Sequence, residues 1–358
     1  MGEKAKMSVR PTRTMAPEVL RDFMTRMLRA AGCSDVNATE TAEVFLEADL
    51  RGVGMQGLDH MFAMLDDLRR GTIDGQGRAE ITREGPATAL VDGHRGPGQP
   101  GGVFATDVAI RKAKEAGCAT VGLINGADIY MVGYYAERMA NAGLAGFVFS
   151  AAPSLVHPYG GVERRLGTNP IAIGIPTGSD DPVVLDMATS ALSFSRVKFA
   201  AYHGEHLPEG MGVDLDGNPT TEAVKIVEGA IAPLAGHKGF GLGLCVALLS
   251  GPLVGGLAGK AIDGWLSEDG DRGVRGHTFM AIDPAAFGDP DVFRANSQSY
   301  IDEVKSSRKA PGVESIRMPG ERALTRRRES LAQGVEVLEK TWEIAGQYAA
   351  KLGVEVPN

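Results

Sequence analysis

The chain has 358 residues, of which 43% are hydrophobic and 23% charged, a composition typical of a globular protein with one large or two ordinary domains. Its net charge of −8 argues against a nucleic-acid surface. The three cysteines, Cys33, Cys118 and Cys245, form neither a zinc pattern nor a disulfide framework, so we expect a cytoplasmic protein. The N-terminus has no apolar segment, and we expect neither secretion nor a membrane span.

The first part of the chain is predicted to be helical. Apolar residues recur at helical spacing in residues 20–28, 37–52 and 61–71, and a glycine lies at or just after the end of each pattern. We therefore expect a helical N-terminal part that spans residues 1–76.

A change of period from Thr88 onward predicts an α/β core over residues 77–288. Short β-rich runs alternate with helical segments that end in glycine, although the long loops do not give a clean repeat of βαβ units. The β-rich runs are TALVD, ATVGLI, GFVFS, IAIGIP and VVLDM. An apolar stretch from Gly241, interrupted by Pro252, predicts a buried helix that ends near Gly251.

The charged segment after about residue 289 is predicted to be helical again. Its apolar residues fall on one helical stripe. The residues of this stripe are Leu331, Val335, Leu338 and Trp342. We expect residues 289–358 to form a helical C-terminal part that packs back on the N-terminal part.

The most informative motif is the turn Gly-Thr-Asn-Pro at residues 167–170, which precedes an apolar run. Gly167 gives the backbone freedom, and Pro170 fixes the exit from the turn. Thr168 and Asn169 offer a hydroxyl and an amide beside backbone N–H donors, which suits a ligand's phosphate or carboxamide. A purely structural turn is the alternative.

Four motifs in the same order carry a resemblance to a known family. They are PYGGVERRLGTNPIAIGIPT, VLDMATS, LAGHKGFGLGL and IRMPGER. The chain resembles, from about Leu50 to Arg322, the type 2 malate/L-lactate dehydrogenases, NAD(P)-dependent oxidoreductases that include reductases of ureidoglycolate, sulfolactate, diketogulonate and cyclic imino acids. The resemblance implies a non-Rossmann α/β fold, NAD or NADP as cofactor, a small-molecule substrate and a homodimer.

The resemblance also implies a cofactor site built from these motifs. Its residues would be Gly167, Thr168, Asn169, Pro170, Asp186, Ser190, His237, Lys238, Gly320, Glu321 and Arg322. His237 and Lys238 supply cationic or donor groups between glycines that allow a phosphate to approach closely, and Arg322 suits a phosphate at the other end. Capping of a helix is the alternative role for Asp186.

A second glycine pattern, Gly96, Gly98 and Gly101, matches the dinucleotide fingerprint G-x-G-x-x-G. Pro97 and Pro100 remove backbone donors from this loop, and no acidic residue closes the next strand at the expected place. We therefore expect no Rossmann site here.

The histidines of the sequence H-G-E-H, His203 and His206, have a spacing that could serve a metal on a helix. The intervening glycine and the nearby Pro208 favour a loop instead, and no third ligand is evident. We expect no metal site.

The catalytic motifs depart from the family pattern. In the family, a Ser-His-Gly-x-x-Arg motif after Asp-x-Arg-Gly supplies a proton donor and a cation for the substrate carboxylate. Here Asp49 and the three residues after it keep the Asp-x-Arg-Gly motif. In the motif that follows, Gln56 stands in place of the histidine and His60 in place of the arginine. Gln56 donates a hydrogen bond but cannot exchange a proton at useful pH.

Two more positions change. Asp128 replaces the histidine of the family motif Asn-Ser-x-His, and His157 stands before a Pro-aromatic-Gly-Gly turn where a small residue is usual. A carboxylate in place of a histidine would favour a cationic substrate such as a protonated imine. We name Gln56, His60, Asp128 and His157 as candidate catalytic residues.

Two explanations compete for these departures. Either the site has been rebuilt for a different substrate, or catalysis has been lost while cofactor binding survives. The favoured hypothesis is an NAD(P)H-dependent reductase or dehydrogenase of a small 2-oxo, 2-hydroxy or imino acid with an atypical active site. The alternatives are an isomerase or lyase that uses His60, His157 and Asp128 as acid and base, and a dinucleotide-binding protein without turnover.

Overall fold

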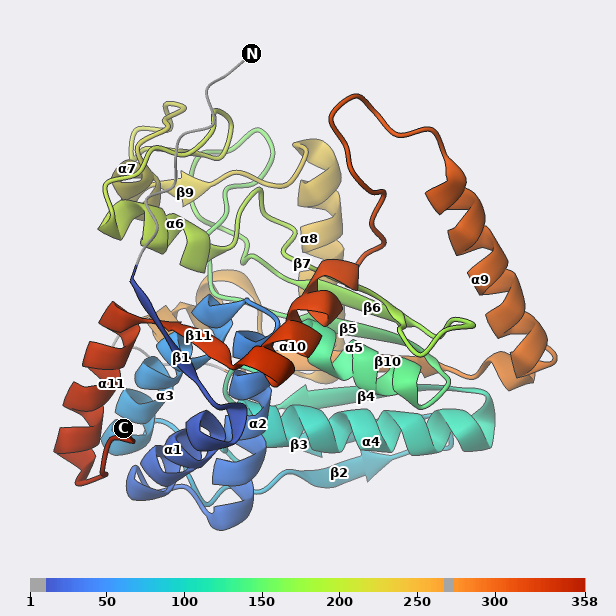
Figure 1. Cartoon of the computed structure of the whole chain (residues 1–358), viewed down its shortest axis with the longest axis horizontal. Coiled ribbons are helices and arrows are strands. Elements are labelled where there is room, and N and C mark those ends of the chain that lie inside the picture. The colour runs from blue at the N-terminus through green and yellow to red at the C-terminus, as the bar shows by residue number, and fades with distance from the viewer. Residues whose placement is uncertain (1–10, 267–273, 358) are drawn as a thin grey trace. The chain divides into compact units, whose positions relative to one another are not determined.

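The computed structural model describes residues 11–266 and 274–357 (Figure 1). Residues 1–10, which contain most of the N-terminal segment discussed above, lie outside the described residues. The rest of the chain confirms the predicted α/β class, with helices that pack around a sheet of seven strands.

The chain divides into two compact units. The smaller unit consists of Met1–Gly75 and Ala323–Asn358, and the larger unit consists of Gln76–Arg322. The first boundary therefore lies next to the expected end of the N-terminal part. The second lies at Arg322 instead of near residue 289, because the helix after residue 289 groups with the larger unit.

The three N-terminal helices are confirmed in the smaller unit. Its helices are α1 (Pro17–Ala30), α2 (Asp35–Leu50), η1 (Gly54–Gln56), α3 (Leu58–Arg70) and α11 (Glu339–Leu352), and α10 (Glu321–Gln333) crosses the boundary. The Ser34 hydroxyl accepts a hydrogen bond from the Asn37 N–H at 3.3 Å and begins α2. Gly71, with φ of +72°, ends α3. The rings of Phe23 and Trp342 lie 5.3 Å apart and join α1 to α11.

The predicted continuous helical stripe near the C-terminus is wrong. Gly334 adopts φ of +100° and ends α10, and the chain then forms the strand β11 (Val335–Leu338). This strand pairs antiparallel with β1 (Thr12–Met15). Val335 and Val337 are buried on one side of β11, so their spacing of two residues, which suits a strand, prevails over the helical pattern.

The larger unit contains a mixed sheet with the strand order β2-β3-β4-β10-β5-β6-β7. The strands are β2 (Glu80–Glu84), β3 (Thr88–Asp92), β4 (Cys118–Ile124), β5 (Ala145–Ser150), β6 (Ile171–Ile175), β7 (Val183–Met187) and β10 (Gly276–Ile282). The five predicted strands are all present. Strands β2 and β10 were not predicted. Strand β10 lies at the centre of the sheet, antiparallel to both β4 and β5.

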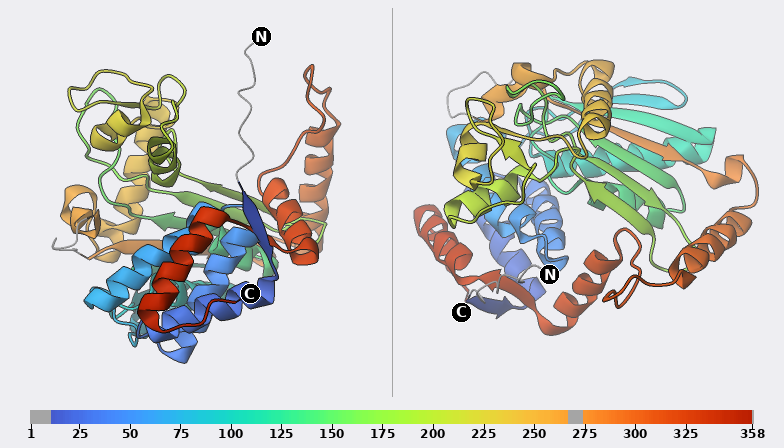
Figure 2. Two further views of the ribbon diagram at one scale, coloured as in Figure 1. Left: turned by 60° about the vertical axis from the view of Figure 1, so that its left-hand side comes forward. Right: turned by 90° about the horizontal axis from the view of Figure 1, so that it is seen from above.

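Helices cover both faces of this sheet, as Figures 1 and 2 show. On one face, α4 (Gly98–Ala116) and α5 (Val132–Asn141) pack on a core that includes Tyr135 and Phe279. On the other face, Val246 of α8 (His237–Ser250) packs against Phe149 and Ile171. Val148 and Phe149 point to opposite faces, as successive residues of a strand must.

The remaining elements of the larger unit are those of a small lobe, a peripheral helix and three short 3-10 helices. They are α6 (Phe194–Tyr202), β8 (Gly212–Val213), α7 (Ala223–Glu228), β9 (Ala230–Ile231), η2 (Pro252–Val254), η3 (Gly259–Leu266), η4 (Pro284–Ala286) and α9 (Pro290–Ser306). The lobe has its own core, in which Val197 and Ile226 are buried. By contrast, α9 buries no residue fully.

Helix α8 ends at Ser250, as predicted, but the expectation that it is buried is wrong for one of its faces. Gly243, Val246 and Ala247 are buried, whereas the leucines of the opposite face are exposed. The exposed leucines of α8 and the turns after it are Leu242, Leu244, Leu248, Leu249, Leu253 and Leu257. Among the described residues, His237–Val254 has the length and apolar character to cross a membrane, and 33% of it is buried.

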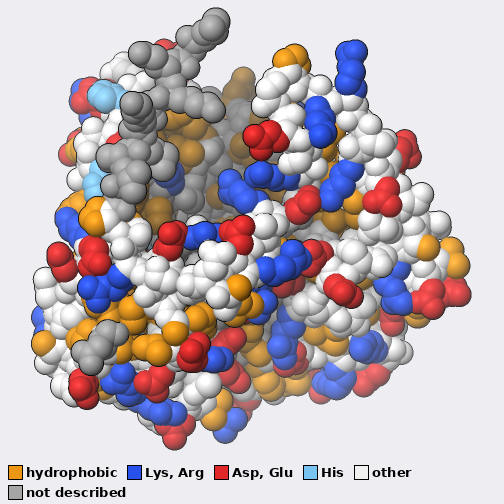
Figure 3. All heavy atoms as spheres, in the orientation of Figure 1, with side chains coloured by type: hydrophobic (Ala, Val, Ile, Leu, Met, Phe, Trp, Pro, Cys, Tyr) orange, Lys and Arg blue, Asp and Glu red, His pale blue; other side chains and the backbone are white. Residues whose placement is uncertain are grey.

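The surface charges are mixed in sign. On the face drawn in Figure 3, lysine and arginine side chains are interspersed with aspartate and glutamate side chains. This distribution fits the net charge of −8 and shows no basic patch on that face.

Candidate active site

Several polar residues meet at one end of the sheet in the larger unit. Strands β3, β4 and β5 all run in the same direction, because β3 is parallel to β4 and β10 is antiparallel to both β4 and β5. Their carboxyl ends lie beside the start of β10, where Ser150 is paired with His277 and Ile124 with Gly276. The carboxyl ends of parallel strands commonly form ligand sites in α/β folds.

The Gly-Thr-Asn-Pro turn lies at this same end, just before β6. Asn169 is 1% exposed, and its Oδ1 accepts a hydrogen bond from the Ala152 N–H at 3.1 Å. Its Nδ2 donates to the backbone oxygen of Gly243 at 3.0 Å. Asn169 therefore ties the turn to two other segments, the one that follows β5 and helix α8. Both ends of its side-chain amide form hydrogen bonds within the protein.

Thr189 joins the other two motifs to this turn. Its hydroxyl donates to the backbone oxygens of Thr168 at 3.0 Å and Asn169 at 3.1 Å, and its own carbonyl accepts from the Leu234 N–H at 2.9 Å. A Cβ on Gly243 would lie 2.7 Å from the Thr189 hydroxyl, so a glycine is required there. The structure thus brings together three segments that the sequence places far apart.

The first turn of α8 presents donors toward solvent beside this junction. His237 and Lys238 are exposed, and Gly236, with φ of +66°, directs the chain into the helix. The ring of Tyr159 lies 5.8 Å from that of His237. The positive end of a helix dipole, its N–H groups and a lysine together suit an anion.

Asp186 and Ser190 have internal partners. The Asp186 carboxylate accepts the Gly133 N–H at 2.9 Å, in the first turn of α5, so it caps a neighbouring helix. A Cβ on Gly133 would lie 2.7 Å from Asp186 Oδ2, which explains the glycine. Ser190 is 3% exposed, and its hydroxyl donates to the Leu192 carbonyl at 2.6 Å.

The Gly320–Glu321–Arg322 segment lies against the outer edge of β7. The Val184 N–H donates to the Pro319 carbonyl at 3.1 Å, and Gly320 adopts φ of +88°. Glu321 accepts the Met318 N–H at 2.9 Å and pairs with Lys305 at 3.1 Å. Both contacts hold the pKa of Glu321 below its usual value, and the hydrogen bond from the Met318 N–H is the larger cause. Glu321 thus stabilises the turn before α10.

Asp128 follows β4 and forms an ion pair with Arg275, at the start of β10. Arg275 Nη1 lies 3.1 Å from Asp128 Oδ2, and Arg275 Nε donates to the Ala151 carbonyl at 2.7 Å. The other carboxylate oxygen of Asp128 accepts the Tyr130 N–H at 2.9 Å. Sequence reasoning missed Arg275, although an arginine directly before the apolar run GHTFMAI is the signal that could have found it.

His277, on β10, was also missed. It is fully buried, and its Nδ1 lies 2.9 Å from the Ser150 hydroxyl. Burial, with the nearby Arg275 guanidinium as the smaller cause, lowers the pKa of His277 to about 3. The ring is therefore neutral at physiological pH and cannot act as a proton donor in the manner of a charged imidazole.

His157 belongs to the lobe of the larger unit. Its N–H donates to the Ile231 carbonyl at 3.1 Å, and its ring Nδ1 lies 2.9 Å from the Pro158 carbonyl. Tyr159, which packs on His237, follows two residues later. His157 is therefore two residues away from a side chain that contacts the start of α8. Its contact with a substrate stays a prediction.

Gln56 and His60 lie in the smaller unit. The Asp49 carboxylate accepts the Leu58 N–H at 3.0 Å and begins α3, and His60 Nδ1 contacts the Met55 carbonyl. A Cβ on Gly57 would lie 2.2 Å from Asp49, so these motif residues form one local structure that orients His60. That they meet Asp128 and His157 in one site stays a prediction.

The G-x-G-x-x-G glycines serve packing. A Cβ on Gly98 would lie 2.1 Å from the Asp128 carbonyl, and one on Gly101 would lie 3.3 Å from Leu123. These glycines let the start of α4 approach β4 and the loop after it. The structure therefore agrees with a non-Rossmann fold.

The H-G-E-H histidines are separated. The His203 ring packs at 4.6 Å from the Phe199 ring, whereas His206 Nδ1 lies 3.2 Å from the Thr221 hydroxyl. Within residues 11–266 and 274–357, no group of three His, Cys, Asp or Glu side chains is arranged to hold a metal ion.

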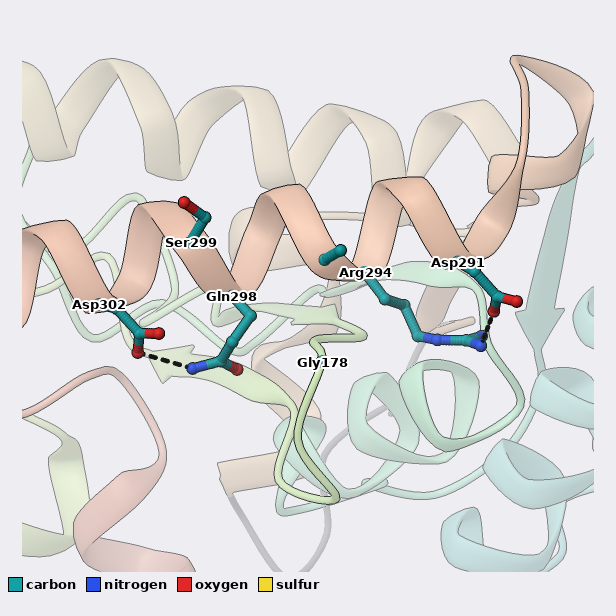
Figure 4. A pocket seen from close by; sticks show the side chains of 7 residues that line it. Gly178, Asp291, Arg294, Gln298, Ser299 and Asp302 are labelled. Carbon is teal, nitrogen blue, oxygen red and sulfur yellow. Dashed lines mark hydrogen bonds and ion pairs between the residues drawn. The ribbon is translucent and has the colours of Figure 1, made fainter.

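A pocket of about 590 Å³ lies elsewhere, between α9 and the turn that joins β6 to β7 (Figure 4). Its lining residues are Gly178, Asp291, Arg294, Ala295, Gln298, Ser299 and Asp302. Arg294 pairs with Asp291, and Gln298 donates to Asp302 at 2.8 Å (Figure 4). Because β6 begins beside Asn169 and ends at this turn, the pocket lies at the opposite end of the strand from the Gly-Thr-Asn-Pro turn.

Comparison with known proteins identifies relatives over nearly the whole chain. The chain is 36% identical to malate dehydrogenase of Pyrococcus horikoshii, covering 94% of each. It is 35% identical to L-sulfolactate dehydrogenase of Methanothermobacter thermautotrophicus, covering 91% of this chain and 92% of the relative. It is 32% identical to a Delta(1)-pyrroline-2-carboxylate/Delta(1)-piperideine-2-carboxylate reductase of Pseudomonas putida, covering 90% and 92%.

Solved structures agree with these sequence matches. The structure of malate dehydrogenase from Pyrococcus horikoshii OT3 superposes with a TM-score of 0.88 at 33% identity and 97% coverage of each chain. That of sulfolactate dehydrogenase from Methanocaldococcus jannaschii gives 0.88 at 32% identity, covering 96% of this chain and 98% of the other. The profile of the malate/L-lactate dehydrogenases matches residues 15–344, and the chain belongs to this family.

Proposed function

We propose that this chain is an NAD(P)H-dependent reductase or dehydrogenase of a small 2-oxo, 2-hydroxy or imino acid. The observation that carries the proposal is the junction of three motifs through Asn169 and Thr189, beside the first turn of α8. The named relatives act on malate, sulfolactate and cyclic imino acids, which share a small carboxylate-bearing skeleton.

The residues at this junction fit a nicotinamide dinucleotide. NADH or NADPH supplies a hydride to a carbonyl or imine carbon when bound. The turn at residues 167–170 would hold the carboxamide side, and His237 and Lys238 would hold a phosphate at the start of α8, where exposed donors and the helix dipole coincide. Asn169 would contribute by fixing the turn, while Arg322 would face the far end of the cofactor.

Reduction of a carbonyl or imine also requires a proton at the reacting oxygen or nitrogen. We propose His60 and His157 as the candidates for this proton, because Gln56 cannot exchange one and His277 is buried and neutral. Gln56 would donate a hydrogen bond to the substrate. Asp128 would face the substrate from the loop after β4.

The test is a scan of 2-oxo acids and cyclic imino acids for oxidation of NADH and NADPH by the purified protein. Turnover of at least one such acid supports the proposal. Cofactor-dependent thermal stabilisation without any turnover would support a binding protein, and substrate conversion without cofactor oxidation would support an isomerase or lyase.

We propose further that two copies associate through the exposed leucines of α8. A helix that is apolar all round is normally covered on all sides, and no residue between Lys238 and Lys260 is charged, so the net charge of −8 does not oppose contact there. Leu244→Glu or Leu248→Glu should then shift the mass measured by light scattering from dimer to monomer. A wild-type monomer would contradict this interface.

We place the protein in the cytoplasm. Cys118 and Cys245 are exposed free thiols, and such thiols persist in a reducing compartment. Fractionation of cells that express the chain would test this location.

A further inference from the structure

The Asp128–Arg275 ion pair lies beside the turn proposed to hold the nicotinamide. Arg275 Nε donates to the Ala151 carbonyl at 2.7 Å, and the next residue, Ala152, donates its N–H to Asn169 Oδ1 at 3.1 Å. The peptide unit between Ala151 and Ala152 therefore contacts both side chains. Its carbonyl accepts from Arg275, and its N–H donates to Asn169. The ion pair is thus part of the same end of the sheet as the cofactor motifs.

The two members of the pair differ in exposure. The Arg275 side chain is 5% exposed, whereas that of Asp128 is 37% exposed. The carboxylate therefore covers the guanidinium and faces outward. A buried arginine without its carboxylate would be an unpaired charge at this end of the sheet.

The loop that carries Asp128 is held in an unusual conformation. Asn125 and Tyr130, which are not glycines, have φ of +54° and +58°. The Tyr130 N–H donates to Asp128 Oδ1, and the Asn125 amide donates to Asp92 at 2.9 Å. Such backbone conformations cost free energy and cluster at functional sites, and here they direct Asp128 toward Arg275.

We propose that the Asp128–Arg275 pair selects the substrate by charge, an inference that rests on the proposed function. The chain has its own cation for Asp128, so this carboxylate is not reserved for a cationic substrate. Its outward face repels a second carboxylate or a sulfonate and accepts a neutral or protonated nitrogen or a hydroxyl. The substrate class is therefore a monoanionic oxo or imino acid, in contrast to the dianions malate and sulfolactate.

In this proposal, Asp128 neutralises a guanidinium that would otherwise bind an anion. Asp128→Asn keeps the volume of the side chain and an oxygen for the Tyr130 N–H, but it removes the charge that neutralises Arg275. Arg275 would then carry an uncompensated charge, which attracts an added dianion to this position. We choose oxalate as the probe, because two planar carboxylates match a guanidinium.

The experiment measures oxalate binding to the full-length chain by calorimetry. We expect Asp128→Asn to bind oxalate at least tenfold more tightly than the wild type, and the double variant Asp128→Asn/Arg275→Met to lose this gain. The matched control is Asp107→Asn, which removes the carboxylate of an exposed ion pair with Arg138 (2.7 Å) and should leave oxalate affinity unchanged.

Two results would overturn the proposal: no gain of oxalate affinity in a folded Asp128→Asn protein, or a gain that persists in the double variant. Thermal unfolding would establish that each variant is folded, and the double variant avoids an unpaired buried charge. The oxalate measurement needs no cofactor. A wild type that binds neither NADH nor NADPH would therefore contradict the proposed function by a separate result.

Discussion

Asn169 donates a hydrogen bond from its side-chain amide to the backbone oxygen of Gly243, and this contact at 3.0 Å joins the Gly-Thr-Asn-Pro turn to helix α8. The two residues are 74 positions apart. The turn and the first residues of α8 are the segments that we propose to hold the two sides of the cofactor. Their relative position depends on this bond and on the one from Ala152.

Asn169→Ala should therefore reduce both stability and cofactor affinity. The Ala152 N–H and the Gly243 carbonyl would each lose a buried partner, which costs about 2 to 4 kcal/mol of unfolding free energy in total. Urea denaturation and NADH titration would measure the two effects. Asn296→Ala, at an exposed position on α9, is the control and should change neither. Unchanged stability of Asn169→Ala would contradict the assigned role.

Lys238→Ala should weaken binding of NADH and NADPH by about tenfold or more, because a charge-assisted contact to phosphate is lost. The exposed Lys225, which pairs with Glu222, provides the matched control, and Lys225→Ala should leave the affinity unchanged. Equal affinities of the wild type and Lys238→Ala for both cofactors would show that no cofactor phosphate contacts Lys238 at the start of α8.

Malate and lactate should be poor substrates. As the resemblance implies, His60 stands where the family has a carboxylate-binding arginine, and Gln56 stands where it has a proton donor. In the proposed site, Asp128 would repel the second carboxylate of malate. Steady-state assays with either acid should give turnover far below about 10 per second, a typical enzyme rate. Turnover of malate at that rate would show that these substitutions do not set the specificity.

The stability of the larger unit should depend on pH through His277. Its pKa falls from the ordinary value of 6.5 to about 3 on folding, so between these pH values the unfolded chain binds a proton that the folded chain does not. Stability is complete above about pH 6.5 and decreases as the pH falls toward 3. Chemical denaturation across this window should show that His277→Gln has a shallower slope, by up to about 1.4 kcal/mol per pH unit. An unchanged slope would mean that His277 is charged in the folded protein.

Local patterns predicted the elements that depend on local spacing. The helices before Gly71 and the strand runs such as TALVD follow from apolar periodicity and from glycines at their ends. Strand β10 was missed because its place between β4 and β5 depends on pairing with residues more than 120 positions away. The C-terminal helix was predicted as continuous because Val335 fits both a helical and a strand period, and only the pairing with β1 decides between them.

The same limit applies to the site. Sequence motifs identified the Gly-Thr-Asn-Pro turn and the start of α8, yet they did not show that the Asn169 amide is engaged inside the protein. Nor did they show the partner of Asp128, because Arg275 precedes a strand that was not predicted. A motif reports the type of a residue, while its partner is set by long-range packing.

Calorimetric titration of the wild-type chain with NADH and NADPH tests the central proposal most directly. We expect at least one of them to bind with a dissociation constant on the order of micromolar, in keeping with a preformed site of glycine-flanked donors. Absence of heat and of thermal stabilisation with both cofactors would contradict the proposed cofactor site and the reductase function with it.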